Sequence, residues 1–372
     1  MFEKLTSPPR TWNAEGFDQS GLQAIFLEGP PWHGRETRIF AYMGLPARRS
    51  DEKVPAMVLV HGGGGTAFAE WVRLWNKAGY AAIAMDTCGC TAGGEHANRP
   101  RHALGGPPGW GGFDQIDEPF EDMWAYHATQ AVIRAHSLLR SMPEIDPNLI
   151  GLTGISWGGV LACMVAGLDP RFAGVCPVYG TGYLQGLLNW ESDFKKMSAE
   201  QLNRWSRLCD PLSYLPHARV PMLWVTGTND FAFSMQALQR SYRLPLGPRE
   251  LVVRTDMKHG HEEGWAPKEI LAWADGWSGR GPGLPKITRQ GRDGRTLWLQ
   301  YAPATGMAIT QAELCYTTDT GSWVDRKWHV VAADIDPASN RVQATLPENT
   351  AMAYLNITDS RGLVASGEHV GM

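Results

Sequence analysis

The pentapeptide G-I-S-W-G at 154–158 places Ser156 between two glycines, and a third glycine, Gly159, follows directly. The apolar run at 149–153 predicts a short buried strand before the motif, and the apolar run at 160–166 predicts a helix after it. Small residues on either side of the serine permit the sharp turn that lifts its hydroxyl out of the sheet. A serine displayed in this way is typical of a nucleophile that forms an acyl-enzyme.

A serine hydroxyl becomes a good nucleophile only when a base takes its proton and an acid orients that base. The chain offers both groups at strand ends. The strand predicted at 221–225 leads into a loop that carries Asp230, and the strand predicted at 251–254 leads to His259. We therefore predict a catalytic triad of Ser156, Asp230 and His259.

Two residues are alternatives within this triad. His261 is a second candidate for the base, and Asp256 is a weaker candidate for the acid. Loop aspartates are often turn formers and loop histidines are often simply solvated. Counting from the preceding strand favours His259, and three candidates that follow three strand ends favour a triad over coincidence.

A loop of four glycines, Gly62 to Gly65, follows His61 and a predicted strand at 56–60. Without Cβ atoms, such a loop can point backbone N–H groups at a developing oxyanion. The loop resembles the HGGG-type loop of lipases and esterases. That resemblance implies that Gly63 and Gly64, together with the amide of Trp157, form the oxyanion hole. A phosphate-binding loop is disfavoured because no Lys-Ser or Lys-Thr follows the glycines.

The elements that must position these residues alternate between strand and helix patterns. Strands are predicted at 56–60, 81–85, 149–153, 174–178, 221–225 and 251–254, with helices at 67–78 and 124–141. Such alternation predicts a mostly parallel sheet with helices on both faces, which is an α/β fold class. Two earlier β-rich runs, 22–27 and 37–43, predict an opening hairpin within residues 1–50.

The chain is predicted to divide after this sheet. The α/β domain covers 51–277 and carries two insertions, 87–117 and 179–218, the second with a helix at 199–208. A Gly- and Pro-rich linker at 278–285 follows. Residues 286–372 read as short strands separated by turns, which predicts a small all-β, sandwich-like C-terminal domain.

The insertions and neighbouring loops carry tryptophans, of which the chain has sixteen. Trp110, Trp190 and Trp265 are candidates for the substrate pocket because aromatic rings suit acyl or sugar groups, although core packing explains each equally well. The pair Cys88 and Cys90 lies near His96 and His102, but the spacing fits no usual zinc pattern. We therefore predict no metal and no cofactor.

Composition limits the partners. A net charge of -4 over 372 residues disfavours nucleic acid, and no apolar run reaches the length of a membrane span. The N-terminus lacks the apolar stretch of a secretory leader, and six scattered cysteines indicate no disulfide framework. We expect a cytoplasmic protein, or a secreted one if a leader has been removed; the sequence is also compatible with a homo-oligomer.

The sequence S-M-P-E-I-D-P at 141–147, leading into the 151–159 segment, is similar to the acetyl xylan esterase and prolyl oligopeptidase-like (dienelactone hydrolase-like) branch of the α/β-hydrolase superfamily. The resemblance covers roughly residues 22 to 277 and includes the chain order Ser156, Asp230, His259. It implies the α/β-hydrolase fold. The region beyond Pro285 is more weakly similar to β-domains appended to bacterial esterase-like proteins.

These patterns predict a serine carboxylester hydrolase that acts on short acyl esters, with acetyl esters of carbohydrates as the implied substrates. An amidase or exopeptidase of the prolyl oligopeptidase-like type is the alternative within enzymes. The fifty-odd residues before the first sheet strand cannot encode the propeller of those peptidases, which disfavours it. A third alternative is a catalytically weak carbohydrate-binding or scaffolding protein, against which the complete triad argues.

Overall fold

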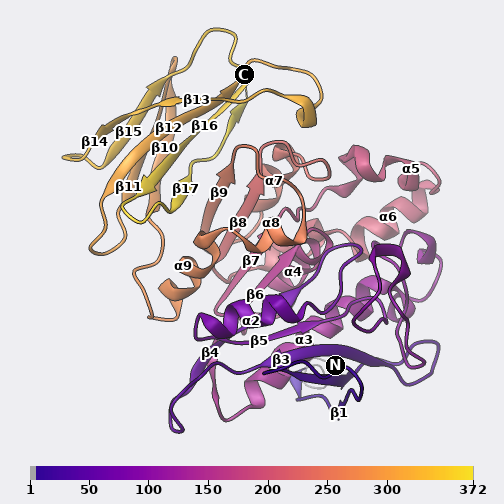
Figure 1. Cartoon of the computed structure of the whole chain (residues 1–372). Helices are drawn as coiled ribbons and strands as arrows, with labels where there is room; N and C mark the ends of the chain where they lie inside the picture. Colours follow the sequence, from indigo (N-terminus) through magenta and orange to yellow (C-terminus); the bar gives the residue numbers. More distant parts are fainter. Residues whose placement is uncertain (1–5, 372) are drawn as a thin grey trace.

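The computed structural model describes residues 6–371, so 1–5 and 372 lie outside the described part of the chain. The N-terminal run from which we predict no secretory leader therefore lies partly outside it. Figure 1 shows a large sheet flanked by helices, with a second group of strands from the C-terminal third of the chain beside it. Between residues 6 and 371, no helix combines the length and apolar character needed to cross a membrane.

Nine strands form one open sheet in the order β1-β2-β3-β5-β4-β6-β7-β8-β9. Their bounds are β1 Thr11–Asn13, β2 Gln23–Glu28, β3 Arg38–Gly44, β4 Val54–Val60, β5 Ala81–Met85, β6 Ile145–Ile155, β7 Gly174–Val178, β8 Met222–Gly227 and β9 Arg249–Arg254. Strands β4 to β9 pair in parallel, whereas β1, β2 and β3 pair antiparallel. The predicted mostly parallel sheet is confirmed, and β2 and β3 pair antiparallel within the region of the predicted opening hairpin.

Helices cover both faces of this sheet. Their bounds are α2 Ala69–Lys77, α3 Trp124–Ser141, α4 Trp157–Leu168, α5 Glu191–Phe194, α6 Ala199–Leu208, α7 Met235–Tyr242, α8 His261–Trp265 and α9 Lys268–Trp277. Successive residues of a strand point to opposite faces. On β6, Thr153 lines a hollow between α2, α8 and α9, while the neighbouring Gly154 packs against Gly158 of α4. These two contacts place α2, α8 and α9 on one face of the sheet and α4 on the other.

Short 3-10 helices lie in the connecting loops. Their bounds are η1 His96–Asn98, η2 Phe113–Gln115, η3 Phe120–Asp122, η4 Leu184–Gly186, η5 Leu188–Trp190, η6 Pro211–Ser213, η7 Leu215–His217 and η8 Trp323–Asp325. Most of them belong to the two predicted insertions, which pack against each other. Trp205 of α6 donates its indole N–H to Gly111 O at 2.8 Å, and its ring stacks on Phe113 at 5.4 Å between centroids. Phe113 also contacts Trp157, so the paired insertions form a cap beside the residue that follows Ser156.

The C-terminal strands form two antiparallel sheets. One has the order β10-β11-β15-β14 and the other β13-β12-β16-β17, with β18 also on β16. Their bounds are β10 Lys286–Asp293, β11 Thr296–Ala302, β12 Ile309–Thr317, β13 His329–Ala332, β14 Asp334–Asp336, β15 Arg341–Thr345, β16 Met352–Asp359, β17 Val364–Ser366 and β18 Val370–Gly371. Leu299 and Leu355 belong to one apolar core that both sheets share, as in a sandwich. We propose that the boundary lies at the predicted linker.

The C-terminal sheets cover the free edge of the large sheet at β9 (Figure 1). Ser366 Oγ accepts a hydrogen bond from Val253 N at 2.8 Å, and Asn356 Nδ2 donates to Val253 O at 3.2 Å. A small apolar cluster joins the two parts around Met235, Val253 and Tyr354. Covering an edge strand with side chains in this way satisfies backbone groups that would otherwise be open to pairing.

Candidate active site

Ser156 lies at the junction of β6 and α4, where the sharp turn gives it a φ of 57°. A non-glycine residue in this region costs on the order of 1–3 kcal/mol and persists only when its surroundings impose it. They do so here, because a Cβ on Gly154 would lie 2.1 Å from Gly158 O and a Cβ on Gly158 would lie 2.1 Å from Val60 O. The G-x-S-x-G glycines are therefore steric requirements of the turn.

Asp230 follows β8 and bonds His259, which follows β9. His259 Nδ1 lies 2.6 Å from Asp230 Oδ2, and the carboxylate side chain is fully buried. Asp230 Oδ1 accepts hydrogen bonds from the N–H groups of Ala232 at 2.9 Å and Phe233 at 2.8 Å. Three hydrogen bonds thus hold the carboxylate, and its bond to Nδ1 leaves Nε2 of the neutral imidazole as the free basic nitrogen. Asp256 is exposed and has no bond to His259.

Three aromatic side chains that the sequence analysis did not single out surround the His259 ring. Tyr179 stacks on it at 4.4 Å between centroids, Phe231 lies at 4.7 Å and Phe233 at 6.1 Å. Tyr179 directly follows Val178, whose carbonyl accepts a hydrogen bond from Ser156 N. This stacking brings the imidazole to the strand end beside the serine. A usable signal was present, since each aromatic comes just after a predicted strand or the predicted acid.

His261, the alternative base, lies at the start of α8 beside the glycine loop. Its Nε2 accepts a hydrogen bond from Gly62 N at 3.0 Å, and its ring packs on Phe68 at 4.8 Å. Burial lowers its pKa to about 4. Its accepting nitrogen is already engaged, and no carboxylate bonds its ring. Ser156 Oγ has no hydrogen bond to either histidine within residues 6–371; nucleophile and base are often apart before substrate binds.

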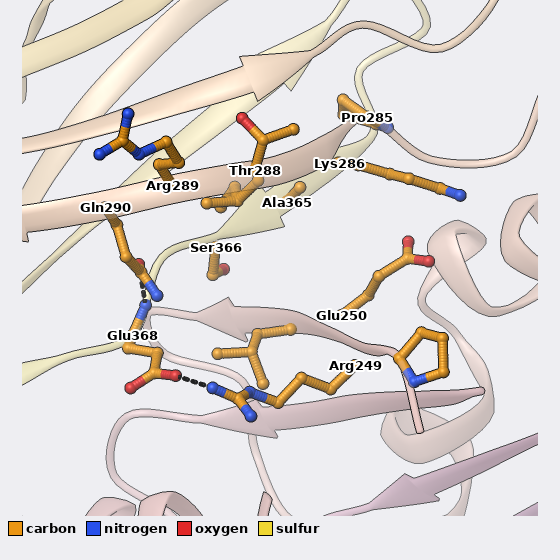
Figure 2. A pocket seen from close by; sticks show the side chains of 13 residues that line it. Arg249, Glu250, Pro285, Lys286, Thr288, Arg289, Gln290, Ala365, Ser366 and Glu368 are labelled. Atoms are coloured by element: carbon orange, nitrogen blue, oxygen red, sulfur yellow. Dashed lines mark hydrogen bonds and ion pairs between the residues drawn. The ribbon is translucent and has the colours of Figure 1, made fainter. Parts of the chain in front are cut away.

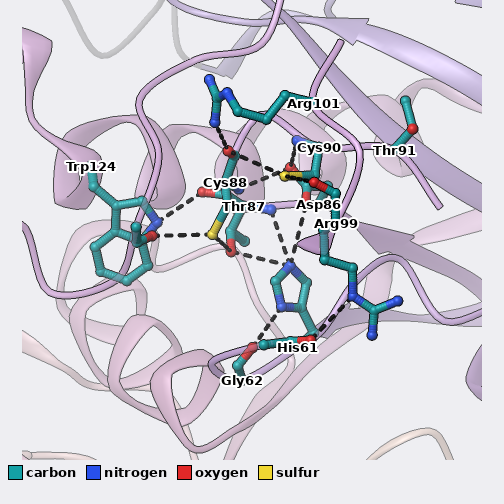
Figure 3. Close-up of polar contacts among 12 residues, drawn as sticks. His61, Gly62, Asp86, Thr87, Cys88, Cys90, Thr91, Arg99, Arg101 and Trp124 are labelled. Atoms are coloured by element: carbon teal, nitrogen blue, oxygen red, sulfur yellow. Dashed lines mark hydrogen bonds and ion pairs between the residues drawn. The ribbon is translucent and has the colours of Figure 1, made fainter. Parts of the chain in front are cut away.

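The glycine loop is held from beneath by His61 (Figure 3). Its Nδ1 lies 2.8 Å from Gly62 O, and its Nε2 accepts from Thr87 N at 3.1 Å. The first contact requires Nδ1 to carry the proton, so the ring is neutral. Burial lowers the pKa of His61 to about 4, which keeps it in this form. His61 therefore ties the loop after β4 to the loop after β5.

The predicted oxyanion residues differ in their surroundings. A Cβ on Gly63 would lie 3.2 Å from the Trp157 ring, so Gly63 is next to the residue that follows Ser156. Gly64 has a φ of 70°, and a Cβ there would collide with the His96 ring. A side chain at Gly64 is therefore excluded, whereas one at Gly63 would be in tight contact with the Trp157 ring. Gly63 and Trp157 lie together, whereas Gly64 faces His96.

The structure brings two of the three candidate pocket tryptophans to this place. Trp110 lies beside Gly63, and Trp190 packs edge-to-face on Trp157 at 5.2 Å. Trp265 instead packs on Trp71 of α2 and lines the hollow between α2, α8 and α9. The prediction that Trp265 lines the substrate pocket is therefore not supported by its contacts.

Cys88 and Cys90 are buried free thiols at the base of the first insertion (Figure 3). Their N–H groups both donate to Asp86 Oδ2 at 2.8 Å, so the pair forms a turn around a carboxylate. Burial raises the pKa of Asp86 to about 6. No group of three or more His, Cys, Asp or Glu residues in the described chain is arranged to hold a metal ion.

A separate cavity of about 520 Å³ lies between β9 and β10, at the junction with the C-terminal sheets (Figure 2). Arg249, Glu250 and Lys286 line it, and Glu368 crosses its edge to bind Arg249. None of the triad candidates lines this cavity. It belongs to the domain junction and is distinct from the candidate active site.

Comparison with known proteins identifies the architecture. Residues 32–197 match the family model of acetyl xylan esterase. An acetyl xylan esterase from Paenibacillus sp. R4 superposes with a TM-score of 0.56 at 21% identity, over 69% of this chain and 86% of that one. The chain therefore has an α/β-hydrolase fold, and residues 32–197 are similar to the acetyl xylan esterase family. Acetyl xylan esterase 1 from Thermoanaerobacterium sp. JW/SL YS485 superposes on this chain with a TM-score of 0.55 at 18% identity, over 70% of this chain and 87% of that one.

One sequence relative of this chain is named for the release of acylamino acids. The acylamino-acid-releasing enzyme of Rattus norvegicus is 26% identical over 220 residues, which cover 54% of this chain. The match spans only 27% of the rat enzyme, about a quarter of its length. The comparisons thus show the fold and a similarity to acetyl xylan esterases, and the reaction, acyl group and leaving group are matters for proposal.

Proposed function

We propose that this protein is a serine carboxylester hydrolase with Ser156 as nucleophile, His259 as general base and Asp230 as the orienting acid. The observation that carries the proposal is the 2.6 Å contact between a fully buried carboxylate and His259, beside a serine held at a positive φ. A neutral imidazole fixed at Nδ1 and free at Nε2 is the form that accepts a hydroxyl proton.

In the proposed reaction Ser156 Oγ attacks the acyl carbonyl while His259 Nε2 takes its proton. The amides of Trp157 and of Gly63 or Gly64 donate hydrogen bonds to the tetrahedral oxyanion. Such donors contribute most to the rate because negative charge develops on that oxygen in the transition state. His259 then returns the proton to the leaving alcohol, and water repeats the sequence on the acyl-enzyme. Buried Asp230 stabilises the imidazolium during each transfer.

A short acyl group fits the site best. Aromatic rings surround Trp157, with Phe113 and Trp190 of the cap at 6.0 Å and 5.2 Å and Trp124 of α3 at 5.6 Å between centroids. Close-packed rings leave little depth for a long chain, since filling a packed site forces strain. The acetyl xylan esterase family match supports acetyl esters of carbohydrates as the first substrates to test.

The test is hydrolysis of p-nitrophenyl esters from acetate to octanoate by wild type, Ser156→Ala and His259→Ala, with His261→Ala as the matched control. We expect turnover to peak at acetate or butyrate and to be lost in the first two variants. In His261→Ala the Gly62 amide loses its acceptor, so activity should fall but persist. Activity that survives His259→Ala and vanishes in His261→Ala would reverse the assignment of the base.

An amidase or exopeptidase is the second candidate, favoured by the match to the rat acylamino-acid-releasing enzyme. Amines leave less readily than alkoxides, so an amidase needs a well-placed general acid in addition to the nucleophile. Parallel assays with acetyl-amino-acid p-nitroanilides and the matching p-nitrophenyl esters separate the two. Turnover of anilides at a rate comparable to that of esters would favour the peptidase.

A binding or scaffolding role without catalysis is the remaining alternative. Labelling of Ser156 by a fluorophosphonate, which requires an activated serine, distinguishes it from the enzyme. Absence of labelling in folded protein would favour the binding role.

A further inference from the structure

The loop that carries the catalytic acid touches the C-terminal sandwich at its outer side. The indole N–H of Trp323, in η8 between β12 and β13, donates to the backbone carbonyl of Asp230 at 2.7 Å. A neutral donor of the C-terminal sandwich thus bonds the acid residue of the α/β part, although the two residues are 93 positions apart in the sequence. The acid is therefore held on both sides, by Ala232 and Phe233 N–H groups within the loop and by Trp323 from outside.

The residue before the acid makes a second connection to the same segment. Asn229 Nδ2 donates to the backbone carbonyls of Arg326 at 2.8 Å, Val324 at 2.9 Å and Trp323 at 3.2 Å. Its Oδ1 accepts from Thr228 Oγ1 at 2.7 Å, so the side-chain amide is fully used. One asparagine that bridges three carbonyls of a single turn leaves that turn little freedom to move relative to the loop.

Apolar contacts restrain only part of the acid loop. Phe231, which contacts the His259 ring, is 52% exposed, and Val324 on the facing turn is 36% exposed. Ala232 and Phe233 are each 2% exposed and anchor the part of the loop that follows the acid. At Asn229 and Asp230 themselves, the contacts with the 323–326 turn are the directional hydrogen bonds described above. A displacement of the carboxylate by about 1 Å is enough to cost a large part of a catalytic rate.

We propose that Trp323 and Asn229 are positioning residues, and that the C-terminal sandwich completes the active site by fixing the Asp230 loop against His259. The proposal rests on the proposed triad and assigns the sandwich a part in it. The sandwich then acts on kcat through the orientation of the imidazole, without touching the substrate.

The experiment compares Trp323→Phe with Trp328→Phe in the full chain. Trp328 belongs to the same segment, but its buried indole N–H has no partner among the described residues, so its removal deletes no bond. We expect Trp323→Phe to lower kcat about ten-fold with little change in KM, and Trp328→Phe to leave kcat within about two-fold of wild type. Asn229→Ala should act in the same direction as Trp323→Phe.

The pH profile separates positioning from general destabilisation. A less well oriented carboxylate stabilises the imidazolium less, so the acid limb of the kcat/KM profile should move to lower pH in Trp323→Phe and stay in place in Trp328→Phe. Melting temperatures report the fold of each variant. An unmoved acid limb with wild-type kcat in Trp323→Phe, or equal losses in both variants with equally lowered melting temperatures, would overturn the proposal.

A substrate-independent readout keeps this test apart from the proposed function. The rate of fluorophosphonate labelling of Ser156 depends on His259 and Asp230 but on no ester. Labelling without turnover of any ester would refute the esterase, while slower labelling in Trp323→Phe than in Trp328→Phe would still support the positioning role. Equal labelling rates in wild type and both variants would refute that role even in an active esterase.

Discussion

The proposed oxyanion loop and the acid loop follow strands β4 and β8 of the same sheet, which are separated by β6 and β7, and are held in place by different means. The oxyanion loop after β4 is fixed by His61, whose partners Gly62 and Thr87 belong to the same α/β domain. The acid loop after β8 is fixed on its outer side by Trp323 from the C-terminal sandwich. One half of the machinery is thus self-contained, and the other depends on a second domain.

The difference shows how an active site can become linked to an appended domain. His61 is 2% exposed, so solvent and neighbouring domains have little access to its contacts. The acid loop instead presents its backbone carbonyl and Asn229 at the domain junction. A hydrogen bond made at the junction restrains the acid loop without changing any residue that touches the substrate.

Asp230→Asn should lower kcat by about 10³- to 10⁴-fold, because an amide favours the wrong imidazole tautomer while keeping the geometry. The loop should remain folded, since the remaining oxygen can still accept from Ala232 and Phe233 N–H groups. Steady-state kinetics and a thermal melt measure both points. Asp256→Asn is the matched control and should be nearly as active as wild type. The reverse ranking of the two variants would show that the acid has been misassigned.

On the other side of the contrast, His61→Phe should lower kcat about 100-fold, comparable to the loss of one oxyanion donor. Phenylalanine fills the space but can neither donate to Gly62 O nor accept from Thr87 N, so the Gly63 amide is no longer held. His127→Phe is the control, because His127 is buried on α3 and its ring bonds Glu121 O and no other group within residues 6–371. Similar kinetic losses in both variants at equal melting temperature would remove the special role of His61.

Acidification should act on the self-contained loop. Burial lowers the pKa of His61 to about 4, against 6.5 for the unfolded group, so the unfolded chain binds this proton more tightly. His61 therefore makes the free energy of unfolding fall as pH drops from about 6.5 towards 4, by about 1.4 kcal/mol per pH unit. Asp86, whose pKa burial raises to about 6, acts in the opposite sense over much of this range.

Urea denaturation at pH 7, 6 and 5 isolates the His61 contribution when wild type is compared with His61→Phe. The variant lacks the titrating group but retains Asp86 and the other histidines. Its free energy of unfolding should depend on pH less steeply than that of wild type by about one proton. Parallel curves for the two proteins would mean that the burial of His61 is not linked to stability.

Much of the catalytic domain could be predicted because its signals are local. The helices at 124–141 and 199–208 coincide with α3 and α6, and the strands at 81–85 and 174–178 with β5 and β7. Their apolar periods and flanking turn residues lie within each element. The mostly parallel α/β sheet followed from the alternation of those elements. In the C-terminal region β10 gives no strand signal of its own, because its row of charged and polar residues shows no apolar alternation.

The site residues could be predicted where they directly follow a predicted strand. Ser156, Asp230 and His259 did so, and the structure brings the last two into contact. Trp265 did not reach the serine, because α8 turns it towards α2. Trp323 had no signal at all, since its partner is a backbone carbonyl in another domain. Contacts of this kind depend on how two domains dock, and no periodicity or motif in either domain encodes that.

The smallest expected effect tests whether the acid loop is positioned by Trp323 and Asn229 alone or by the whole domain junction. Glu368 bridges the junction by binding both Arg243 and Arg249. In Arg243→Gln the carboxylate keeps Arg249, and the lost pair is half exposed, so stability should fall by only about 0.2–1 kcal/mol. Turnover and the acid limb of the pH profile should match wild type, because Trp323 and Asn229 remain in place. A loss of kcat in Arg243→Gln as large as in Trp323→Phe would mean that the position of the acid loop depends on the whole interface with the sandwich. Trp323 would then have no specific role.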